Sequence, residues 1–518
     1  MKTNKKNTAV TAAFIVAATL AAKICGMLRD ILVASLYGTS TNEAVAFSTA
    51  TRIPLLFFDI ALGSAVTSAF IPIFNEYLEN DGRKRAIEFS NSFINLVALI
   101  TIVMTAVGMI FSGQFVRLIA GGYDEAKILL ASQLVKILFP TIIFTGVAYC
   151  FVGILQSFGE FYIPAVISLV SNGLLLLYLV FVKDKLGVYG VAAAMLVAWS
   201  AQVIVQIPPL VKMKYSYKMR LNFKDGGIKK VCVLALPIIV STWVQPINTM
   251  VNIRLASGMA GGGAVTALDY ANKLYIILVG VFTFAITNLI FPSLSRAVAK
   301  KDNVEFASLM KNALRYVLFI ITPVMAGFLL LSMPVIRLFY ERGAFGAEST
   351  NLTAAALFFY SLGMLGYGVQ EICNKAFYAM HDGRTPMAVS MGGIAVNIAL
   401  SVFFVLALGK GHWALALAAS VAANIIGITM LFILNKKVKG ILNKQMLVYF
   451  VKILISVLIM SASVLFINNR LGDNASKVIA VMLPACAGAA VYFVCCAVLG
   501  INEISGIVKS VCARRKNG

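Results

Sequence analysis

Long apolar stretches separated by short polar segments run along the whole chain of 518 residues. A helix that crosses the hydrocarbon core of a bilayer, roughly 30 Å thick, needs about 20 mainly apolar residues. By this criterion the pattern predicts fourteen transmembrane helices, at 8–37, 44–77, 86–111, 126–153, 162–182, 188–211, 231–256, 264–291, 312–340, 351–379, 386–408, 413–434, 446–467 and 478–500. The expected fold class is therefore an all-α polytopic membrane protein.

The polar segments between these stretches fall into two alternating sets. One set is rich in Lys and Arg and comprises 2–6, 83–85, 212–230, 296–301, 436–444 and 514–516. The other set is short and nearly uncharged, as at 38–43 and 257–263. Basic loops stay on the cytoplasmic side of a membrane, so both termini are predicted to be cytoplasmic. The first apolar stretch resembles a signal peptide, but it continues through Lys23 and Arg29 and is interpreted as a retained span.

An internal repeat relates the two halves of the chain at an offset of about 220 residues. Pro72 matches Pro292, the stretch from Pro164 matches that from Pro386, and Leu186-Gly187 matches Leu408-Gly409. The repeat predicts two pseudo-symmetric six-helix lobes, 1–211 and 231–435, joined by a basic cytoplasmic linker at 212–230. Helices at 446–500 and a cytoplasmic tail at 501–518 follow. Parallel repeats of this kind enclose a central cavity in transporters.

Composition narrows the function classes further. The chain is 60% hydrophobic and 13% charged, whereas soluble domains are about 45–50% apolar and about 25% charged. The net charge of +23 does not indicate nucleic-acid binding, because the basic residues alternate with the spans. The eight cysteines and two histidines have no metal-ligand spacing, and no phosphate-binding loop motif occurs. We expect neither a metal nor a cofactor, and no enzyme chemistry.

Charged residues inside the predicted spans are the candidate functional residues. A charge at bilayer depth costs about 3 kcal/mol unless it faces protein, water or a polar ligand. Lys23, Arg29 and Asp30 lie in the first span, Arg52 in the second and Lys273 in the eighth. Their positive bias predicts an anion site, and a diphosphate suits Arg and Lys donors well. Lys23 and Asp30 share a helical face, so an internal ion pair between them is the alternative.

A second group of polar residues can line the same cavity. Asp59 shares a face with Arg52, and Glu43 lies near the outer end of the second span. The remaining three form a polar stripe on the seventh span: Gln245, Asn248 and Asn252. Such a stripe either lines a cavity or holds helices together, and the sequence leaves both open.

Several of these residues lie in recognisable stretches. They are Lys23-Ile-Cys-Gly-Met-Leu-Arg-Asp30, Arg52-Ile-Pro54, Ala69-Phe-Ile-Pro72, Ala267-Leu-Asp-Tyr-Ala-Asn-Lys-Leu274, Pro292-Ser-Leu-Ser-Arg296, Arg342-Gly-Ala-Phe345 and Phe377-Tyr-Ala-Met-His-Asp-Gly-Arg-Thr-Pro386. With them the chain resembles the MurJ (MviN) family of lipid II flippases, in the multidrug/oligosaccharidyl-lipid/polysaccharide (MOP) exporter superfamily. The likeness covers the first twelve spans.

This resemblance implies a transporter of the bacterial plasma membrane that moves undecaprenyl-diphosphate-linked peptidoglycan precursor (lipid II) outward by alternating access. The family's cavity arginines in the first span fall at Lys23 and Arg29, and its acid at Asp30. Its other basic residues fall at Arg52 and Lys273. The last two helices are implied to form a groove for the lipid tail, and the expected partners are lipid II and the bilayer. We expect a monomer.

The chain departs from the family pattern in the second span. Many members have Arg-Arg and Phe-Ala-Glu-Gly-Ala there, where this chain has Phe58-Asp59 and Ala61-Leu-Gly-Ser-Ala65. A flippase for another lipid-linked glycan is therefore the alternative, followed by a cation-coupled drug exporter, which the basic bias disfavours. The driving force is left open between the membrane potential and a Na⁺ or H⁺ gradient.

Overall fold

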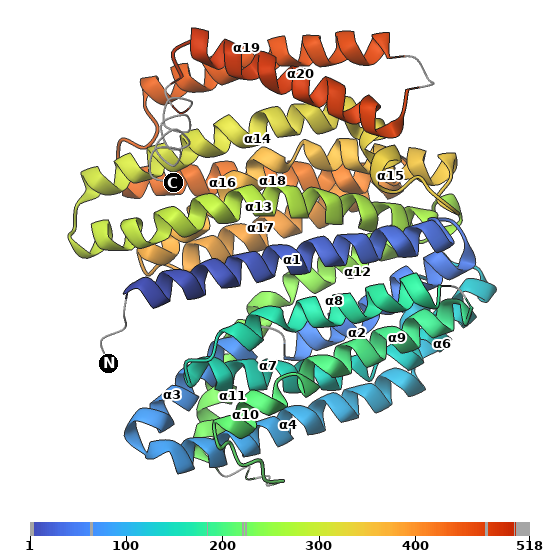
Figure 1. Cartoon of the computed structure of the whole chain (residues 1–518), viewed down its shortest axis with the longest axis vertical. Helices are drawn as coiled ribbons and strands as arrows, with labels where there is room; N and C mark the ends of the chain where they lie inside the picture. The colour runs from blue at the N-terminus through green and yellow to red at the C-terminus, as the bar shows by residue number, and fades with distance from the viewer. Residues whose placement is uncertain are drawn as a thin grey trace. The chain divides into compact units, whose positions relative to one another are not determined.

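The computed structural model describes residues 5–62, 66–183, 185–219, 222, 225–471, 475–501 and 503. Gly63, Ser64, most of the predicted tail and parts of the basic linker lie outside these residues. The chain divides into two compact units, the first comprising 1–266 and 343–345, the second 267–342 and 346–518. Figure 1 labels the helices of both units.

Unit 1 is built from helices joined by turns and, between α10 and α11, by the basic linker. They are α1 (Lys5–Tyr37), α2 (Asn42–Ala61), the π-helix η1 (Val66–Phe70), α3 (Ile71–Asn80), α4 (Gly82–Ile110), α5 (Ser112–Ile119), α6 (Glu125–Leu138), α7 (Thr141–Ser157), α8 (Tyr162–Phe181), α9 (Gly187–Ile204), α10 (Ile207–Lys212), α11 (Gly226–Thr242), α12 (Val244–Ala256) and the 3₁₀ turn η2 (Ala260–Gly262).

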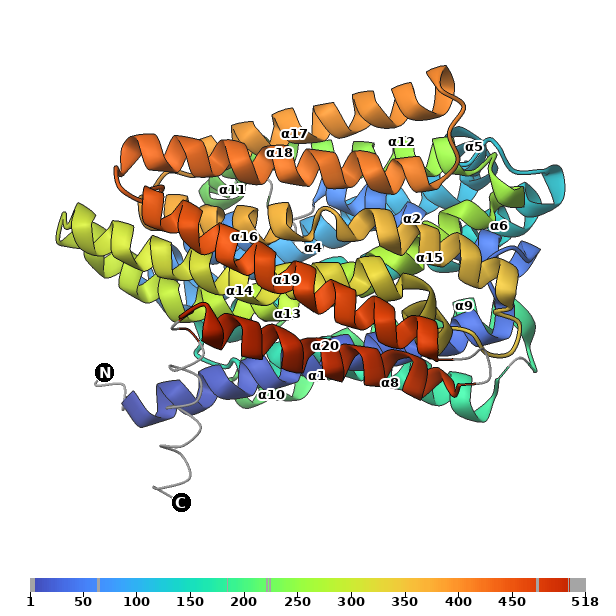
Figure 2. The ribbon, with the colours of Figure 1, turned by 90° about the horizontal axis from the view of Figure 1, so that it is seen from above.

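Unit 2 begins within the long helix α13 (Gly263–Ala299). Its further helices are α14 (Asn303–Phe339), α15 (Ala347–Ser361), α16 (Met364–Ala379), α17 (Arg384–Val402), the π-helix η3 (Phe403–Ala407), α18 (Trp413–Lys437), α19 (Lys444–Arg470) and α20 (Lys477–Val498). Within this unit α17 and α18 lie side by side (Figure 2), and α19 and α20 pack together against α14 (Figure 1).

Helices, or pairs of helices joined by a short break, occupy all fourteen predicted ranges. Among the described residues, 11 helices are long and apolar enough to cross a membrane, or up to 12 if the bent pair α15–α16 is one span. The expectation of an all-α polytopic membrane protein is confirmed. The number of fourteen spans is consistent with these helices and stays a prediction, as do the lobe boundaries drawn from the repeat.

Proline explains a break inside one of these helices, and another proline lies within a helix that continues past it. Pro54 lies inside α2, which ends at Ala61 and continues as η1 and α3. In α14, Leu331 leaves helical geometry (φ −112°, ψ 19°) three residues before Pro334. A proline lacks the N–H that would bond back along the helix and its ring crowds the preceding turn. The helix around Pro54 continues without a non-helical residue as far as Ala61.

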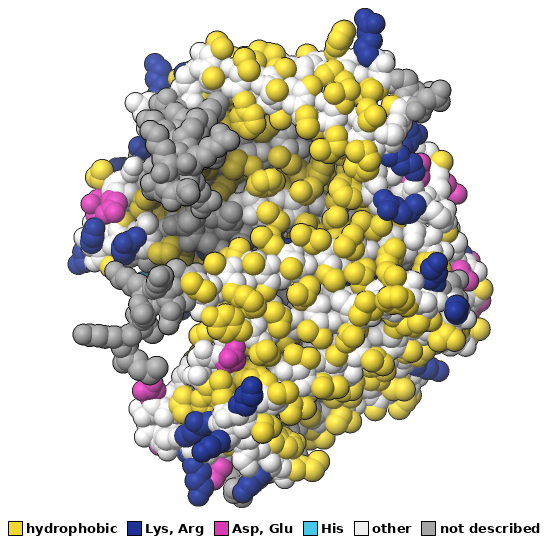
Figure 3. Space-filling view, viewed as in Figure 1, with side chains coloured by type: hydrophobic (Ala, Val, Ile, Leu, Met, Phe, Trp, Pro, Cys, Tyr) yellow, Lys and Arg dark blue, Asp and Glu magenta, His cyan; other side chains and the backbone are white. Residues whose placement is uncertain are grey.

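Hydrophobic side chains cover most of the face seen in Figure 3, and Lys and Arg lie mainly towards its edges. Exposed apolar residues run along the outer sides of the helices, as at Ile102 and Val103 of α4 and at Leu458 of α19. A soluble protein rarely exposes so continuous an apolar surface. In a bilayer this surface faces lipid.

The basic linker of unit 1 is held against α4 by hydrogen bonds from a polar stripe on that helix. Asn91 Nδ2 donates to the Ser216 carbonyl at 2.9 Å and Asn95 Nδ2 to the Lys218 carbonyl at 3.2 Å. Asp225, whose side chain is 1% exposed, ends this segment and accepts from Arg85 Nη2 at 2.9 Å. The polar residues of α4 therefore satisfy extended backbone that would otherwise lack partners.

The stretch from Phe377 to Pro386 forms the turn between α16 and α17. Asp382 accepts hydrogen bonds from the Thr385 backbone N–H at 3.0 Å and from its hydroxyl at 2.7 Å, and it pairs with Lys437 of α18. The hydrogen bond from Lys437, together with those from Thr385, lowers the pKa of the Asp382 carboxyl below its usual range. This cluster fixes the start of α17 against the end of α18.

Candidate functional site

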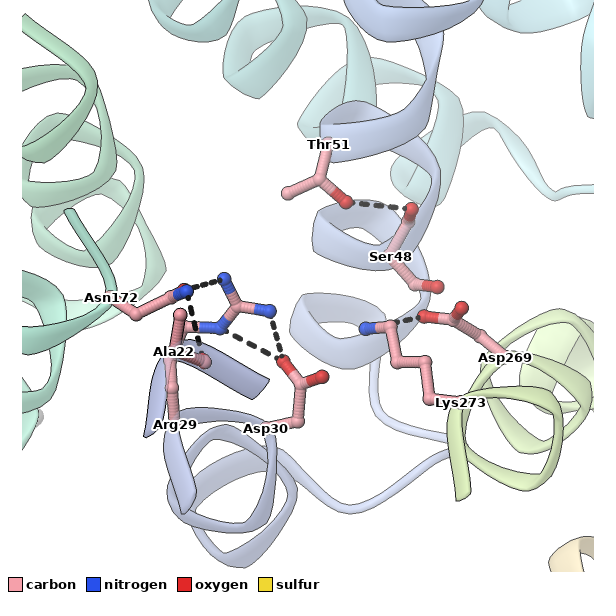
Figure 4. Close-up of polar contacts among 8 residues, drawn as sticks. All are labelled: Ala22, Arg29, Asp30, Ser48, Thr51, Asn172, Asp269 and Lys273. Carbon is pink, nitrogen blue, oxygen red and sulfur yellow. Dashed lines mark hydrogen bonds and ion pairs between the residues drawn. The ribbon is translucent and has the colours of Figure 1, made fainter. Parts of the chain in front are cut away.

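Arg29 of α1 is held in a fixed position inside unit 1 (Figure 4). Its Nε and Nη2 donate to Asp30 Oδ1 at 3.0 and 2.7 Å, and its Nη1 donates to Asn172 Oδ1 of α8 at 2.7 Å. The side chains of Arg29 and Asp30 are only 18% and 12% exposed. The guanidinium therefore does not extend along the helix to the membrane surface; neighbouring side chains orient it.

Asn172 was not a candidate from the sequence, and its role follows from close packing of α1 on α8. A Cβ at Gly26 would lie in ordinary contact with the amide, 3.5 Å from Asn172 Nδ2, so α8 packs directly over this part of α1. The same amide donates to the Ala22 carbonyl at 3.4 Å (Figure 4). A polar residue inside the fifth predicted span, which α8 forms, was the signal available, but only the packing pairs it with Arg29.

Lys23 lies two turns before Asp30 on α1 and is half-buried. It forms no hydrogen bond or ion pair with another residue that the structure describes, and Asp30 pairs with Arg29. The alternative of an internal Lys23–Asp30 ion pair is therefore not what holds α1 in place. Lys23 contributes a positive charge that no described carboxylate neutralises by direct contact.

Arg52 is half-buried on α2, within a polar turn of that helix. Thr51 donates to the Ser48 carbonyl at 3.0 Å (Figure 4), and the hydroxyls of Thr49 and Tyr123 lie 2.6 Å apart. Asp59, two turns further along, is exposed and forms no ion pair within the described part of the chain. Arg52 and Asp59 thus share a helical face without forming a pair.

Unit 2 carries its own ion pair on α13. Lys273 Nζ lies 3.0 Å from Asp269 Oδ2, one turn earlier on the helix (Figure 4), and 5.8 Å from the centre of the Tyr270 ring. The Lys273 side chain is 37% exposed, and that of Asp269 only 8%. Sequence reasoning selected Lys273 and missed Asp269, although the spacing of four residues is the signal for a helical ion pair.

The remaining candidates of unit 1 differ in burial. Glu43 is exposed in the first turn of α2, and Gln245 is exposed at the start of α12. Asn248 is buried, and Asn252 Nδ2 donates to its Oδ1 at 3.4 Å. The polar stripe on α12 therefore makes contacts within its own helix. Whether it also lines a cavity stays a prediction.

At the predicted outer end of unit 1, four glycines allow three loops to meet. We call Gly122, Gly258, Gly262 and Gly263 the glycine seam. A Cβ on Gly122 would lie 2.3 Å from the Gly258 backbone nitrogen, and one on Gly263 would lie 2.6 Å from Ser40 Oγ. Gly262 has φ +91°, a conformation that favours glycine. The Gly122 N–H also donates to Ser257 Oγ at 3.0 Å, so this end of the unit is closely packed.

A segment of the distant loop after α14 joins the same end of unit 1. The Ala344 N–H donates to the Ser35 carbonyl at 2.8 Å, and Phe345 is fully buried. Gly343 has φ +59°, and a Cβ there would lie 2.2 Å from the Ser35 oxygen. The Arg342-Gly-Ala-Phe345 stretch thus requires glycine both for its backbone conformation and for its close contact with α1.

An apolar groove of about 460 Å³ lies in unit 2 between α13, α14, α19 and α20. Its walls include Phe282, Phe319 and Leu331 on one side and Met460 and Tyr492 on the other. The Tyr492 hydroxyl donates to the Phe319 carbonyl at 2.8 Å, which satisfies the one polar group of that ring within the packing. The lining suits a hydrocarbon chain.

The fold is that of a class of transporters. A multidrug resistance MATE family transporter of the MOP superfamily, in an inward-facing conformation, matches with a TM-score of 0.68 and 14% identity over 81% of this chain and 95% of its own. At that identity the likeness concerns the fold alone. A solved structure of lipid II flippase MurJ in an inward closed conformation matches with a TM-score of 0.81 and 26% identity over 95% of this chain and 99% of its own.

Sequence comparison identifies the family. The family model described as lipid II flippase MurJ matches residues 33–486. The probable lipid II flippase MurJ of Rhizobium meliloti (strain 1021) is 30% identical over 395 residues, 74% of this chain and 73% of the relative. The lipid II flippase MurJ of Burkholderia cenocepacia is 27% identical over 431 residues, 82% of each. The chain belongs to the lipid II flippase MurJ family.

Proposed function

We propose that this protein moves lipid II, the undecaprenyl-diphosphate-linked peptidoglycan precursor, from the inner to the outer leaflet of a bacterial plasma membrane. It thereby supplies cell-wall synthesis and acts as a transporter, not as an enzyme. The family match over residues 33–486 carries this proposal. The basic side chains at membrane depth agree with it, because the substrate presents a diphosphate.

The substrate contacts that we propose are made by Lys23, Arg29, Arg52 and Lys273, with Asp30 as the positioning residue for Arg29. Two nitrogens of Arg29 already point at carboxylate Asp30, and its third bonds Asn172, so its plane is fixed before any ligand arrives. A fixed guanidinium loses little conformational freedom when it binds an anion. Lys23 supplies a charge with no described counterion, which attracts the same anion.

We propose that translocation proceeds by alternating access, with the described conformation closed on the outer side. Its support is the glycine seam, where the backbones of Gly122 and Gly258 touch. Opening towards the outside then requires the three loops to part. The six-helix lobes 1–211 and 231–435 are the moving bodies in this proposal, and 212–230 connects them.

The lipid tail is proposed to lie in the apolar groove beside α19 and α20. That groove holds about 460 Å³ and is lined by Phe, Val, Met and Tyr side chains. Bilayer hydrocarbon is as apolar as this lining, so the groove accommodates the tail by van der Waals packing and not by a hydrophobic gain. The tail can remain near lipid while the diphosphate enters the polar part of the protein.

The topology proposed places both termini in the cytoplasm, because the basic loops share one side. The protein is proposed to act as a monomer. An inside-negative potential favours outward movement of an anionic headgroup by about 2.3 kcal/mol per charge per 100 mV. A Na⁺ or H⁺ gradient is the alternative driving force.

Complementation of a conditional lipid II flippase mutant tests the function. The wild-type chain should restore growth and should expose labelled lipid II in the outer leaflet. Arg29→Ala in the same vector is the matched negative control, with membrane abundance measured for both. Growth without leaflet exchange of lipid II would contradict the proposal.

A flippase for another lipid-linked glycan is the second candidate, favoured by Phe58-Asp59 in place of the family's basic pair in the second span. Reconstituted protein that exchanges another undecaprenyl-diphosphate glycan but not lipid II would support that candidate. Both substrates present a diphosphate to the same anion site, so only the attached glycan distinguishes the two candidates.

A further inference from the structure

A second cavity, polar and about 140 Å³ in volume, lies in unit 2 beside α14, near the start of α19 and the end of α20. Its lining includes Arg315, Gln445, Tyr449, Lys452, Ile501 and Glu503. Bulk water occupies about 30 Å³ per molecule, so the cavity has room for a group the size of a phosphate. Both basic residues come from membrane-spanning helices next to basic loops.

The guanidinium of Arg315 is held in place, but one of its hydrogen-bond donors has no acceptor. It lies 5.2 Å from the centre of the Tyr449 ring, and the Tyr449 hydroxyl donates to the Arg315 carbonyl at 3.2 Å. The Nε of Arg315 is buried and has no hydrogen-bond partner among the described residues. A buried donor without an acceptor costs about 1–3 kcal/mol, and a charged one more. An acceptor in the cavity would remove that cost.

Lys452 brings a second cation to the cavity from α19. Its Nζ donates to the Leu499 carbonyl at 2.7 Å, the acceptor at the end of α20. An ammonium has three donors, so two remain for another acceptor. Glu503 lines the cavity beside Tyr449, and its Oε2 is buried without a hydrogen-bond partner in the described chain. The cavity thus offers donors for an anion and one acceptor for a hydroxyl or ammonium.

The cavity continues the direction of the apolar groove. Phe319, which lines the groove, follows Arg315 by one turn of α14, about 6 Å. On α19, Met460 of the groove follows Lys452 by about 12 Å. The three helices that hold both features lie side by side (Figure 1). The polar cavity therefore lies beside one end of the groove.

We propose that this cavity binds the phosphate of a membrane lipid, with Arg315 and Lys452 as donors and Glu503 as acceptor for a hydroxyl or ammonium of the headgroup. The site holds a lipid of the leaflet that the basic loops face. The inference goes beyond the proposed function, because binding here requires no translocation. It concerns side chains separate from Arg29, Arg52 and Lys273.

Native mass spectrometry of the full-length protein tests the site. Phosphatidylglycerol is titrated into wild type, Arg315→Gln and Lys452→Gln, with Lys439→Gln as the matched control. Lys439 is exposed in the preceding loop and lines no part of the cavity. Each variant removes one positive charge. We expect about ten-fold weaker binding for the two cavity variants, as for loss of one charged hydrogen bond, and no change for Lys439→Gln.

Parallel titrations with undecaprenyl diphosphate and inorganic phosphate identify the source of the phosphate. If retention of phosphatidylglycerol depends on Arg315 and Lys452, the site binds a phospholipid. If retention of undecaprenyl diphosphate depends on them, the site binds a prenyl-linked phosphate. Binding of inorganic phosphate alone overturns the proposal, as does equal lipid binding by all variants. Thermal unfolding without lipid checks the fold. If Arg315→Gln fails to fold, Lys452→Gln decides the outcome. Lipid II exchange is not the readout, so failure here leaves the proposed function standing.

Discussion

Replacement of Gly122 by alanine tests whether the glycine seam holds the outer end of unit 1 closed. The added Cβ would lie 2.3 Å from the Gly258 nitrogen, 2.6 Å from its Cα and 2.7 Å from the Ser257 carbonyl carbon. All three are backbone atoms, so no side chain can rotate away. Ordinary contact begins near 3.4 Å, and the two loops must therefore separate by about 1 Å.

The energetic cost follows from this overlap. Forcing one extra carbon into a well-packed site costs about 1–3 kcal/mol. Since 1.4 kcal/mol is a factor of ten in an equilibrium constant, closed molecules should become about 5- to 150-fold less favoured relative to open ones. The open form at the outer end then becomes measurable in a protein that was mainly closed there. Transport slows, because the half of the cycle that requires the closed form is disfavoured.

Thiol labelling measures the shift. In a cysteine-free background, Ser40→Cys lies against Gly263 and should react slowly with a membrane-impermeant reagent. Gly122→Ala should raise its labelling rate by the factor given above. Gly113→Ala is the matched control, since a Cβ there meets nothing within 4 Å. Unchanged labelling in a normally folded Gly122→Ala protein would refute the closure.

Three further predictions address other parts of the molecule. Arg29→Ala and Arg52→Ala should each abolish complementation at near-normal membrane abundance. Arg→Lys at either position should be only partly tolerated, because Lys keeps the charge but loses the planar fork. Full activity of both Ala variants would exclude the anion site. Cysteines at Ser40 and Gly263, where the Cβ atoms would lie 3.3 Å apart, should form a disulfide that stops lipid exchange until reduced; continued exchange in the oxidised protein would rule out alternating access there. Asp225→Asn should destabilise the protein by about 1–3 kcal/mol, because the buried acceptor for half-exposed Arg85 loses its charge. Glu88→Gln, at a half-exposed side chain 3.8 Å from Arg85, should leave thermal unfolding unchanged.

The length of each apolar run was enough to locate the helices. A chain that crosses a bilayer needs about 20 apolar residues, and it must satisfy its backbone polar groups within its own helix. The same reasoning placed charges in α1, α2 and α13, since a charge at membrane depth is costly wherever the chain folds. The sequence likewise contained the stretches that identify the family. Each of these properties depends on a stretch of consecutive residues and not on how distant segments pack.

Only the tertiary structure decided which polar groups meet. Asp30 shares a helical face with Lys23, two turns away, yet it pairs with its neighbour Arg29. Asn172 of α8 accepts a hydrogen bond from the other side of the Arg29 guanidinium and so fixes its orientation. Gly122 and Gly258 lie far apart in sequence and touch because three loops converge. Likewise, Arg315 and Lys452 form one cavity through packing of α14 on α19. Contacts between distant segments depend on how helices pack, and side-chain spacing along one helix does not encode that geometry.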